Sequence, residues 1–216
     1  MKEIVFENAH RRRHFEFFKS MEIPHFNLVA HVDFEAMSKY IKSNQLHFTS
    51  VIVYLVCKTA NSIPELRQRI RGDKIVEHGL VHPSFTVPTE GSDVFSFCYV
   101  DYTEDFPLFS SAMIASIKSK QNTPSFEDEE GRDDYLFLSA MPWVHFTGFS
   151  HAMHTKDVDS VPRIVWGKMG GAGGYLLPLG IQAHHALVDG RHAGKFFNAF
   201  EALCSDPVKA LIPDNA

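Results

Sequence analysis

The sequence has few cysteines, no excess of basic residues and no long apolar run, and each shortage excludes a class of protein. Only three of its 216 residues are cysteines, and all three (Cys57, Cys98 and Cys204) lie in apolar surroundings. They predict buried free thiols in a reducing compartment, because three cysteines cannot all pair in disulfides. Lys and Arg number 21 against 26 Asp and Glu, a net charge of −5, so nucleic acid is not an expected partner.

Membrane insertion and export are not expected either. No apolar stretch approaches the ~20 residues that a membrane-spanning helix needs. The start, Met1-Lys2-Glu3, lacks the basic region and the apolar run of a secretory signal peptide. A hydrophobic content of 44% excludes disorder, and neither a linker nor an internal repeat divides the chain. We therefore expect one cytoplasmic domain over residues 1–216.

The expected secondary structure mixes helices, strands and hairpins. Helices are expected at 33–43, from 49 or 50 to about 64, at 104–120 and after Gly190. Strands are expected at 26–32, 82–87, 94–99, 135–139, 144–149 and 163–168, and in the apolar run 175–179. The acidic segment 121–133 predicts a surface connection, and the glycines at 170–174 predict a hairpin turn, since a phosphate loop would end in Lys-Ser/Thr. This order favours an α+β fold, a mixed β-sheet sandwich flanked by helices.

Two histidines and an aspartate follow the last apolar run. His184 and His185 end the expected strand, and Asp189 is placed to cap the helix after Gly190. A histidine has an ordinary pKa of about 6.5, so it can accept a proton near neutral pH. No Gly-x-Ser-x-Gly motif accompanies it, so we expect the substrate to supply the nucleophile, for example a hydroxyl.

Other interpretations of these histidines stay open. Neighbouring residues of a strand point to opposite faces, so His184 is expected to pack or hydrogen-bond and not to share the chemistry of His185. His185 itself could be a structural histidine near a helix cap. A metal site made of His184, His185, Asp189 and His192 lacks a recognised ligand spacing, so no metal is expected.

Four segments, in order, resemble the chloramphenicol acetyltransferases, a family of coenzyme-A-dependent acyltransferases. Residues 184–190, His-His-Ala-Leu-Val-Asp-Gly, are similar to the family's His-His-x-x-x-Asp-Gly signature. Residues 10–15 resemble its amino-terminal His-Arg-x-x-His-Phe, and residues 81–95 its central hairpin. Residues 139–146 resemble its Ser-x-Asn-Pro-Trp-Val-Ser-Phe. The order and spacing are kept over nearly the whole chain.

The resemblance implies an enzyme that moves the acetyl group of acetyl-CoA onto a hydroxyl of a small molecule, an activity associated with antibiotic resistance. His185 would be the general base, attack would be direct through a tetrahedral intermediate, and Ser139 would hydrogen-bond the oxyanion. Arg11 would form an ion pair with Asp189 and so support the turn. The family assembles as a homotrimer, with each active site between two subunits.

The resemblance also implies an acceptor pocket, and this sequence departs from it. Pocket-lining places fall on Phe18, Phe26, Thr86, Phe95 and Phe149, and Lys168 falls near the coenzyme. Plain core packing is the alternative for these phenylalanines, because the chain has 19 of them. The departures from the drug-acetylating members are Phe18 for tyrosine, Val165 for threonine, Met141 for asparagine, His151 for leucine and Met169 for an aromatic residue. Acyl transfer is therefore a firmer expectation than chloramphenicol as the acceptor.

Two other functions remain open from the sequence. One is the catalytic core of a dihydrolipoamide acyltransferase, although such cores usually follow lipoyl and subunit-binding domains, which are not expected here. The other is a non-catalytic homologue that binds a small aromatic ligand. The intact His185, Asp189 and Ser139 argue against that second alternative.

Overall fold

The computed structural model describes residues 1–122, 131–154 and 158–212. The strands in these ranges are β1 (Lys2–Ile4), β2 (His25–Asp33), β3 (Gln68–Arg71), β4 (Lys74–Glu77), β5 (His82–Pro88), β6 (Phe95–Tyr99), β7 (Tyr135–Met141), β8 (Arg163–Gly167) and β9 (Leu176–His184). The helices are α1 (Ala9–Lys19), α2 (Glu35–Ser43), α3 (Phe48–Asn61), α4 (Phe106–Asn122), α5 (Gly190–Ser205) and α6 (Pro207–Leu211). Short 3₁₀ turns lie at Pro64–Arg67 and Ala172–Gly174.

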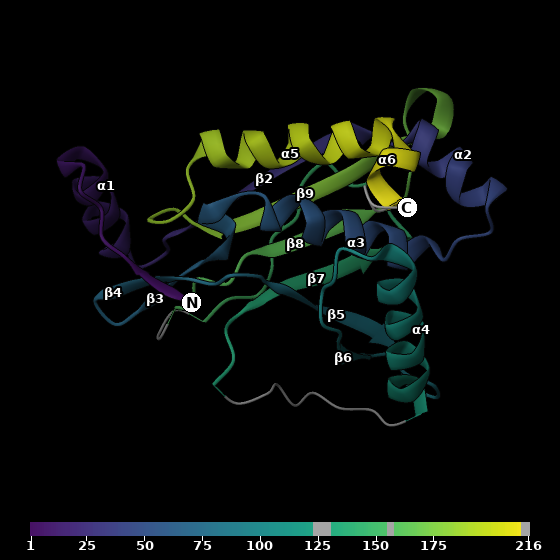
Figure 1. Cartoon of the computed structure of the whole chain (residues 1–216), viewed down its shortest axis with the longest axis horizontal. Helices are drawn as coiled ribbons and strands as arrows, with labels where there is room; N and C mark the ends of the chain where they lie inside the picture. The colour runs from purple at the N-terminus through teal and green to yellow at the C-terminus, as the bar shows by residue number, and fades with distance from the viewer. Residues whose placement is uncertain (123–130, 155–157, 213–216) are drawn as a thin grey trace.

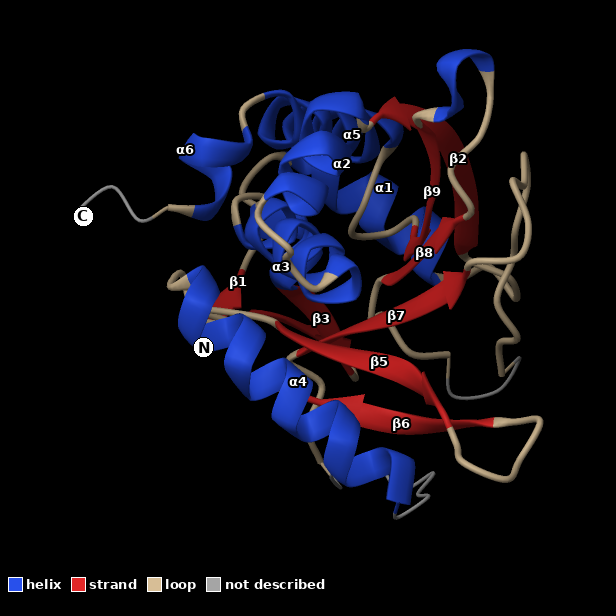
Figure 2. Ribbon diagram, turned by 90° about the vertical axis from the view of Figure 1, so that its right-hand side faces the viewer, coloured by secondary structure: helices blue, strands red, loops and turns tan. Residues whose placement is uncertain are grey.

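The larger sheet has the order β2-β9-β8-β7-β5-β6 and the smaller has the order β1-β4-β3. Strand β7 runs parallel to both of its neighbours, β5 and β8, whereas the other pairs of the larger sheet are antiparallel. Helices α2, α3 and α5 lie on one side of the larger sheet, and long loops lie on the other (Figure 1, Figure 2). A mixed sheet flanked by helices confirms the predicted α+β fold.

Helix α3 lies at the centre of the hydrophobic core, because it is apolar on most sides and most of its residues are buried. Strand β9 faces it with alternate residues, Leu177, Leu179, Ile181 and Ala183, all of which are in the core. The residues between them, including Gly180 and Gln182, therefore point to the outer face of the sheet. The predicted free thiols are also found here, since Cys57, Cys98 and Cys204 are buried and unpaired.

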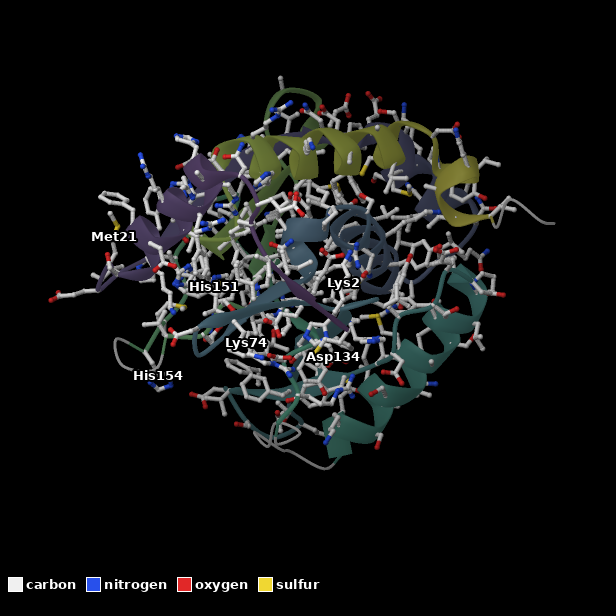
Figure 3. The ribbon with its side chains drawn as sticks, turned by 60° about the vertical axis from the view of Figure 1, so that its left-hand side comes forward. Lys2, Met21, Lys74, Asp134, His151 and His154 are labelled. Atoms are coloured by element: carbon white, nitrogen blue, oxygen red, sulfur yellow. The ribbon has the colours of Figure 1, made fainter. Side chains whose placement is uncertain are left out.

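The strand predicted at 144–149 is wrong. Strand β8 already has β7 on one side and β9 on the other, so no edge remains for another strand beside it. The segment instead packs over the sheet: Lys168 donates its backbone N–H to the Val144 carbonyl at 2.9 Å, and the Phe146 ring lies against Gly167. The loop then continues past the half-buried His151 to His154, which stands out at its edge (Figure 3).

The remaining expected helices and strands are found with shifted ends. The apolar run at 175–179 is part of a longer strand that reaches His184, and the helix expected at 104–120 is α4, Phe106–Asn122. Residues 170–174 form a turn, in which Gly171, Gly173 and Gly174 have positive φ. Most of the surface connection expected at 121–133 lies outside the described residues. Among the helices of the described ranges, none has the length and apolar character that crossing a membrane requires.

We predict that Gly180→Ala destabilises the fold, because β2, β9 and β8 approach closely at this residue. An added methyl group would lie 2.9 Å from Val165 Cγ1 and 3.2 Å from Val29 Cγ2. Both are stiff β-branched side chains, so the expected loss in the free energy of unfolding is about 1–3 kcal/mol.

Gly194→Ala is the matched control, because a methyl group at this position in α5 has no atom within 4 Å. Alanine is favoured over glycine inside a helix by roughly 0.8–1 kcal/mol, so this variant should be more stable than the parent. Urea unfolding of the two variants should therefore shift in opposite directions. Unchanged stability in Gly180→Ala would contradict the close approach of the three strands.

Candidate active site

The segment from His185 to Gly190 turns the chain from β9 into α5. His185 donates its backbone N–H to the Pro24 carbonyl at 2.8 Å, which ties the turn to the start of β2. Asp189 caps α5 as predicted: its side chain accepts from the Arg191 N–H at 3.2 Å, and its own N–H donates to His192 Nδ1 at 3.0 Å. The Arg191 N–H is the main cause that lowers the pKa of Asp189, so this carboxylate is ionised at neutral pH.

The imidazole of His185 is half-buried and held by aromatic rings. Phe18 of α1 stacks on it with ring centroids 3.8 Å apart and an interplanar angle of 12°. Phe26 of β2 lies 4.9 Å away, and His14 approaches edge-on at 5.6 Å. The Nδ1 atom of His185 has no hydrogen-bond partner within the described residues. Packing against these rings therefore orients the imidazole, and no hydrogen bond within the described residues fixes its Nδ1 atom.

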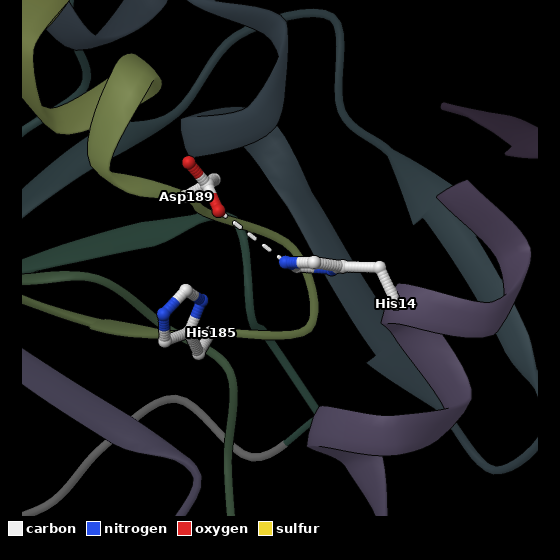
Figure 4. Close-up of side chains that lie close together, drawn as sticks. All are labelled: His14, His185 and Asp189. Carbon is white, nitrogen blue, oxygen red and sulfur yellow. Dashed lines mark ion pairs between the residues drawn. The ribbon is translucent and has the colours of Figure 1, made fainter. Parts of the chain in front are cut away.

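Arg11 supports the turn, but the predicted ion pair with Asp189 is wrong. The two terminal nitrogens of Arg11 donate instead to two backbone carbonyls of the turn, those of Ala186 at 2.8 Å and Leu187 at 2.7 Å. These adjacent carbonyls match the planar guanidinium fork as a carboxylate would. The Asp189 carboxylate faces His14, whose Nε2 lies 3.3 Å from Oδ2 (Figure 4).

The other predicted pocket residues gather in a different place. Thr86, Phe95, Ser139 and Phe149 line one cavity of about 580 Å³ beside the β5–β6 hairpin, together with Trp143. The hydroxyl of Ser139 makes no hydrogen bond to the part of the chain that the structure describes, and the residue is half-buried. It can therefore donate to a ligand.

The sheet register keeps Ser139 away from His185. Ser139 pairs with Val165, which in turn pairs with Gly180 of β9. Two strand spacings, ~10 Å, and the five residues from Gly180 to His185, ~16 Å along the strand, separate the two residues by roughly 19 Å. None of the residues around His185, namely Arg11, His14, Phe18, Phe26 and Asp189, lines the Ser139 cavity. One chain thus carries two separate clusters of predicted site residues.

Lys168 and the departures from the family pattern lie partly near the Ser139 cavity and partly in the core. Lys168 is exposed just after β8 and is bonded through its backbone to Val144, next to the loop residue Trp143. Met141 lines the Ser139 cavity, and the His151 ring packs edge-on against Phe149 with centroids 4.9 Å apart. Met169 packs against the core, and Val165 is buried beside Gly180.

The four residues considered as a metal site are not gathered together. His184 packs against His25 on the outer face, at 5.2 Å, which confirms its predicted orientation away from His185. His192 lies 3.5 Å from Glu65. The structure instead brings ligand atoms of His14, His185 and Asp189 within 4.8 Å of one another. The sequence reasoning missed His14, although it is the second histidine of the His-Arg-x-x-His-Phe motif and lies one helical turn after Arg11.

Comparison with known proteins decides the family. The family model for chloramphenicol acetyltransferase matches residues 1–201. The chain belongs to the chloramphenicol acetyltransferase family. Chloramphenicol acetyltransferase 3 of Escherichia coli is 30% identical over 205 residues, which cover 94% of this chain and 96% of that protein. Chloramphenicol acetyltransferase 2 of Haemophilus influenzae is 28% identical over 92% of this chain and 94% of its own.

Solved structures agree on the fold. A chloramphenicol acetyltransferase superposes with a TM-score of 0.81 at 22% identity and covers 94% of this chain and 100% of its own. A dihydrolipoamide acetyltransferase from Azotobacter vinelandii gives a TM-score of 0.66 at 14% identity, covering 98% of this chain and 94% of its own. With the family shown, the chain is an acetyl-CoA-dependent acetyltransferase.

We predict that acid destabilises this protein through His25, His151 and His184. Burial lowers the pKa of each to about 4 in the folded state, against 6.5 in the unfolded chain. Between these values the unfolded chain binds more protons than the native protein. The free energy of unfolding should therefore be greatest above pH 6.5 and should fall as the pH decreases toward 4.

Replacing one of these histidines tests the assignment. His151→Leu removes one buried titrating group, so urea unfolding should show a flatter loss of stability across the same pH range. His154→Leu is the control, because this histidine of the same loop is exposed (Figure 3), and its slope should match the parent's. If His151→Leu lost stability with decreasing pH as steeply as the parent, His151 would not contribute to the acid destabilisation.

Proposed function

We propose that this protein transfers the acetyl group of acetyl-CoA onto a hydroxyl of a small molecule, with His185 as the general base. The observation that carries the proposal is the His185 imidazole, half-buried, stacked on Phe18 and held at the end of β9 in an acetyltransferase fold. A positioned base of this kind contributes roughly 10²–10⁴-fold to a proton-transfer step.

The reaction follows from the two clusters. His185 removes the proton from the acceptor hydroxyl as its oxygen attacks the thioester carbonyl carbon, and a tetrahedral intermediate forms. The hydroxyl of Ser139 donates a hydrogen bond to the oxyanion, a contact worth roughly 10²–10³ in turnover. The carbon–sulfur bond then breaks, which leaves the acetyl ester of the acceptor, and the proton on His185 passes to the departing thiolate sulfur to give coenzyme A. No acyl-enzyme forms.

Both groups must reach the same reacting carbonyl, so we propose that the active site lies between two copies of the chain. A base and an oxyanion donor each act within about 3 Å of their target atoms, far less than the roughly 19 Å estimated from the register. Exposed apolar side chains beside both clusters support a second copy: Phe17 (60% exposed) and Ile23 (76%) near His185, and Trp143 (74%) at the Ser139 cavity. The assembly proposed is the family's homotrimer.

The cavity at Ser139 supports an acceptor alcohol with an apolar or aromatic body, because Phe95, Trp143 and Phe149 line it. Phe18 has no hydroxyl, so it cannot form a hydrogen bond beside His185 with a polar group of the acceptor other than the reacting hydroxyl. We therefore propose a class of alcohols of which chloramphenicol is one candidate, and antibiotic resistance as the role if it is accepted. The exposed ammonium of Lys168 is proposed to bind the anionic coenzyme.

Two further parts of the proposal rest on other observations. The three buried, unpaired thiols support a reducing, cytoplasmic location. The half-buried position of His185 beside Asp189, and the free hydroxyl of Ser139 in its cavity, support catalysis over a ligand-binding role without chemistry. The dihydrolipoamide acetyltransferase structures share the fold at low identity, so the family match favours the chloramphenicol acetyltransferase type.

Release of free thiol from acetyl-CoA, measured against chloramphenicol and a panel of other alcohols, tests this function. We expect acceptor-dependent thiol release, a loss of roughly 10²–10⁴-fold in His185→Ala, and a fall of roughly 10²–10³-fold in the kcat of Ser139→Ala. The KM of Ser139→Ala should change little, because the contact strengthens in the transition state. The exposed His154→Ala is the control and should keep the parental rate.

Full activity in His185→Ala would remove the proposed base. Unchanged turnover in Ser139→Ala would remove the proposed oxyanion donor. No thiol release with any alcohol, together with calorimetric binding of an aromatic ligand but not of acetyl-CoA, would favour the non-catalytic alternative.

A further inference from the structure

His14 stands where a direct ion pair between Arg11 and Asp189 was expected. Its Nδ1 lies 2.7 Å from a terminal nitrogen of Arg11, and its Nε2 lies 3.3 Å from Asp189 Oδ2. Arg11 and Asp189 are therefore linked through an imidazole. Figure 4 shows the side chain of His14 extending from α1 toward the Asp189 carboxylate, with His185 close to both.

The link fixes where the His14 proton lies. A guanidinium has only donors and stays protonated, so His14 Nδ1 must accept from Arg11. A neutral imidazole then carries its hydrogen on Nε2, the atom that faces the Asp189 carboxylate. Burial and the Arg11 charge both lower the pKa of His14, which keeps the ring neutral. At 3.3 Å Nε2 is close to the Asp189 carboxylate but not aligned for a hydrogen bond, and it is a buried nitrogen with no other hydrogen-bond partner within the described residues. Such contacts often tighten only when substrate binds.

We propose that His14 is a positioning residue for the acetyl transfer: held by Arg11 as the Nε2–H tautomer, it fixes Asp189 and with it the turn that carries His185. The proposal rests on the proposed function, since His185 is the base that is positioned. His14 meets His185 only edge-on, ring to ring, and forms no hydrogen bond with it, so its proposed effect passes through Asp189. The aspartate both caps α5 and ends the five-residue turn from His185, so a shift of its carboxylate moves the base.

The same geometry argues against a cation bound by His14, His185 and Asp189, although two imidazoles and a carboxylate are a common donor set for zinc. A metal needs the lone pair of His14 Nε2. That nitrogen holds the proton as long as Nδ1 accepts from Arg11. Metal binding would therefore require the Arg11–His14 contact to break.

Two substitutions separate positioning from packing. His14→Phe keeps a ring against Phe18, with which His14 now packs at 4.7 Å, but removes the hydrogen bond with Arg11 and the 3.3 Å contact with Asp189. His14→Gln loses the ring but keeps an acceptor for Arg11 and an N–H for Asp189. We expect kcat to fall roughly 10- to 100-fold in His14→Phe, the order expected for a misplaced catalytic group, with the KM for acetyl-CoA within about twofold, and His14→Gln to recover most of the loss.

The reverse order, with His14→Phe active and His14→Gln impaired, would show that His14 only packs and would overturn the proposal. A second expectation concerns Asp189→Asn: combined with His14→Phe it should cost less than the product of the two single losses, because the residues act as one unit. Multiplicative losses would contradict the link between them.

The ¹⁵N signals of His14 in the unmodified protein test the tautomer without any variant. We expect Nδ1 to show the shift of an unprotonated nitrogen and Nε2 that of a protonated one, and addition of Zn²⁺ to leave both unchanged. A proton on Nδ1, or stoichiometric Zn²⁺ binding at this histidine, would overturn the proposal. Since this measurement needs no activity, it also separates failure of the His14 proposal from failure of the proposed acetyl transfer.

Discussion

The hydrogen-bonded register of β7, β8 and β9 is the constraint on which the rest of this site depends. It sets Ser139 opposite Val165 and Val165 opposite Gly180, and it leaves His185 beyond the far end of β9. A β-ladder cannot shift by fractions of a residue, and slipping it by one residue would turn Ser139 and the core residues of β7 to the wrong faces. The separation between the proposed base and the proposed oxyanion donor is therefore built into the fold, and in the proposed enzyme each chain offers two half-sites.

The half-site around His185 is held by two different kinds of force. Apolar rings, chiefly Phe18, fix the orientation of the imidazole by stacking, and they leave its Nδ1 without a hydrogen bond. Charged and polar groups fix the backbone that carries it: Arg11 binds two carbonyls of the turn, and the Pro24 carbonyl accepts the His185 N–H. Such a division leaves the buried Nδ1 of His185 without a hydrogen bond within the described residues while the turn stays tied down. A fixed imidazole is what a base needs to act on a substrate proton.

Local patterns in the sequence were sufficient to predict the strand end at His184, the Asp189 cap and the family. The first two depend on neighbouring residues, and the family depends on motifs that keep their order along the chain. The partner of Arg11 was not predictable in this way. Whether a guanidinium binds a carboxylate or two backbone carbonyls depends on the path of the turn in space. Either pair of oxygens can accept the two parallel N–H bonds of the guanidinium. The prediction of a strand at 144–149 was wrong for a related reason. Alternating apolar residues suit both a strand and a loop packed over a sheet.

Co-expression of His185→Ala with Ser139→Ala, each carrying a different affinity tag, measures the central claim that one active site draws on two chains. Each variant alone lacks one reacting group in every site. If each site takes His185 from one copy and Ser139 from another, every hybrid trimer contains one site with both groups, so the doubly purified hybrids should regain about one third of parental activity. Hybrids as inactive as the two single variants would contradict a shared site and would require both groups to act within one chain.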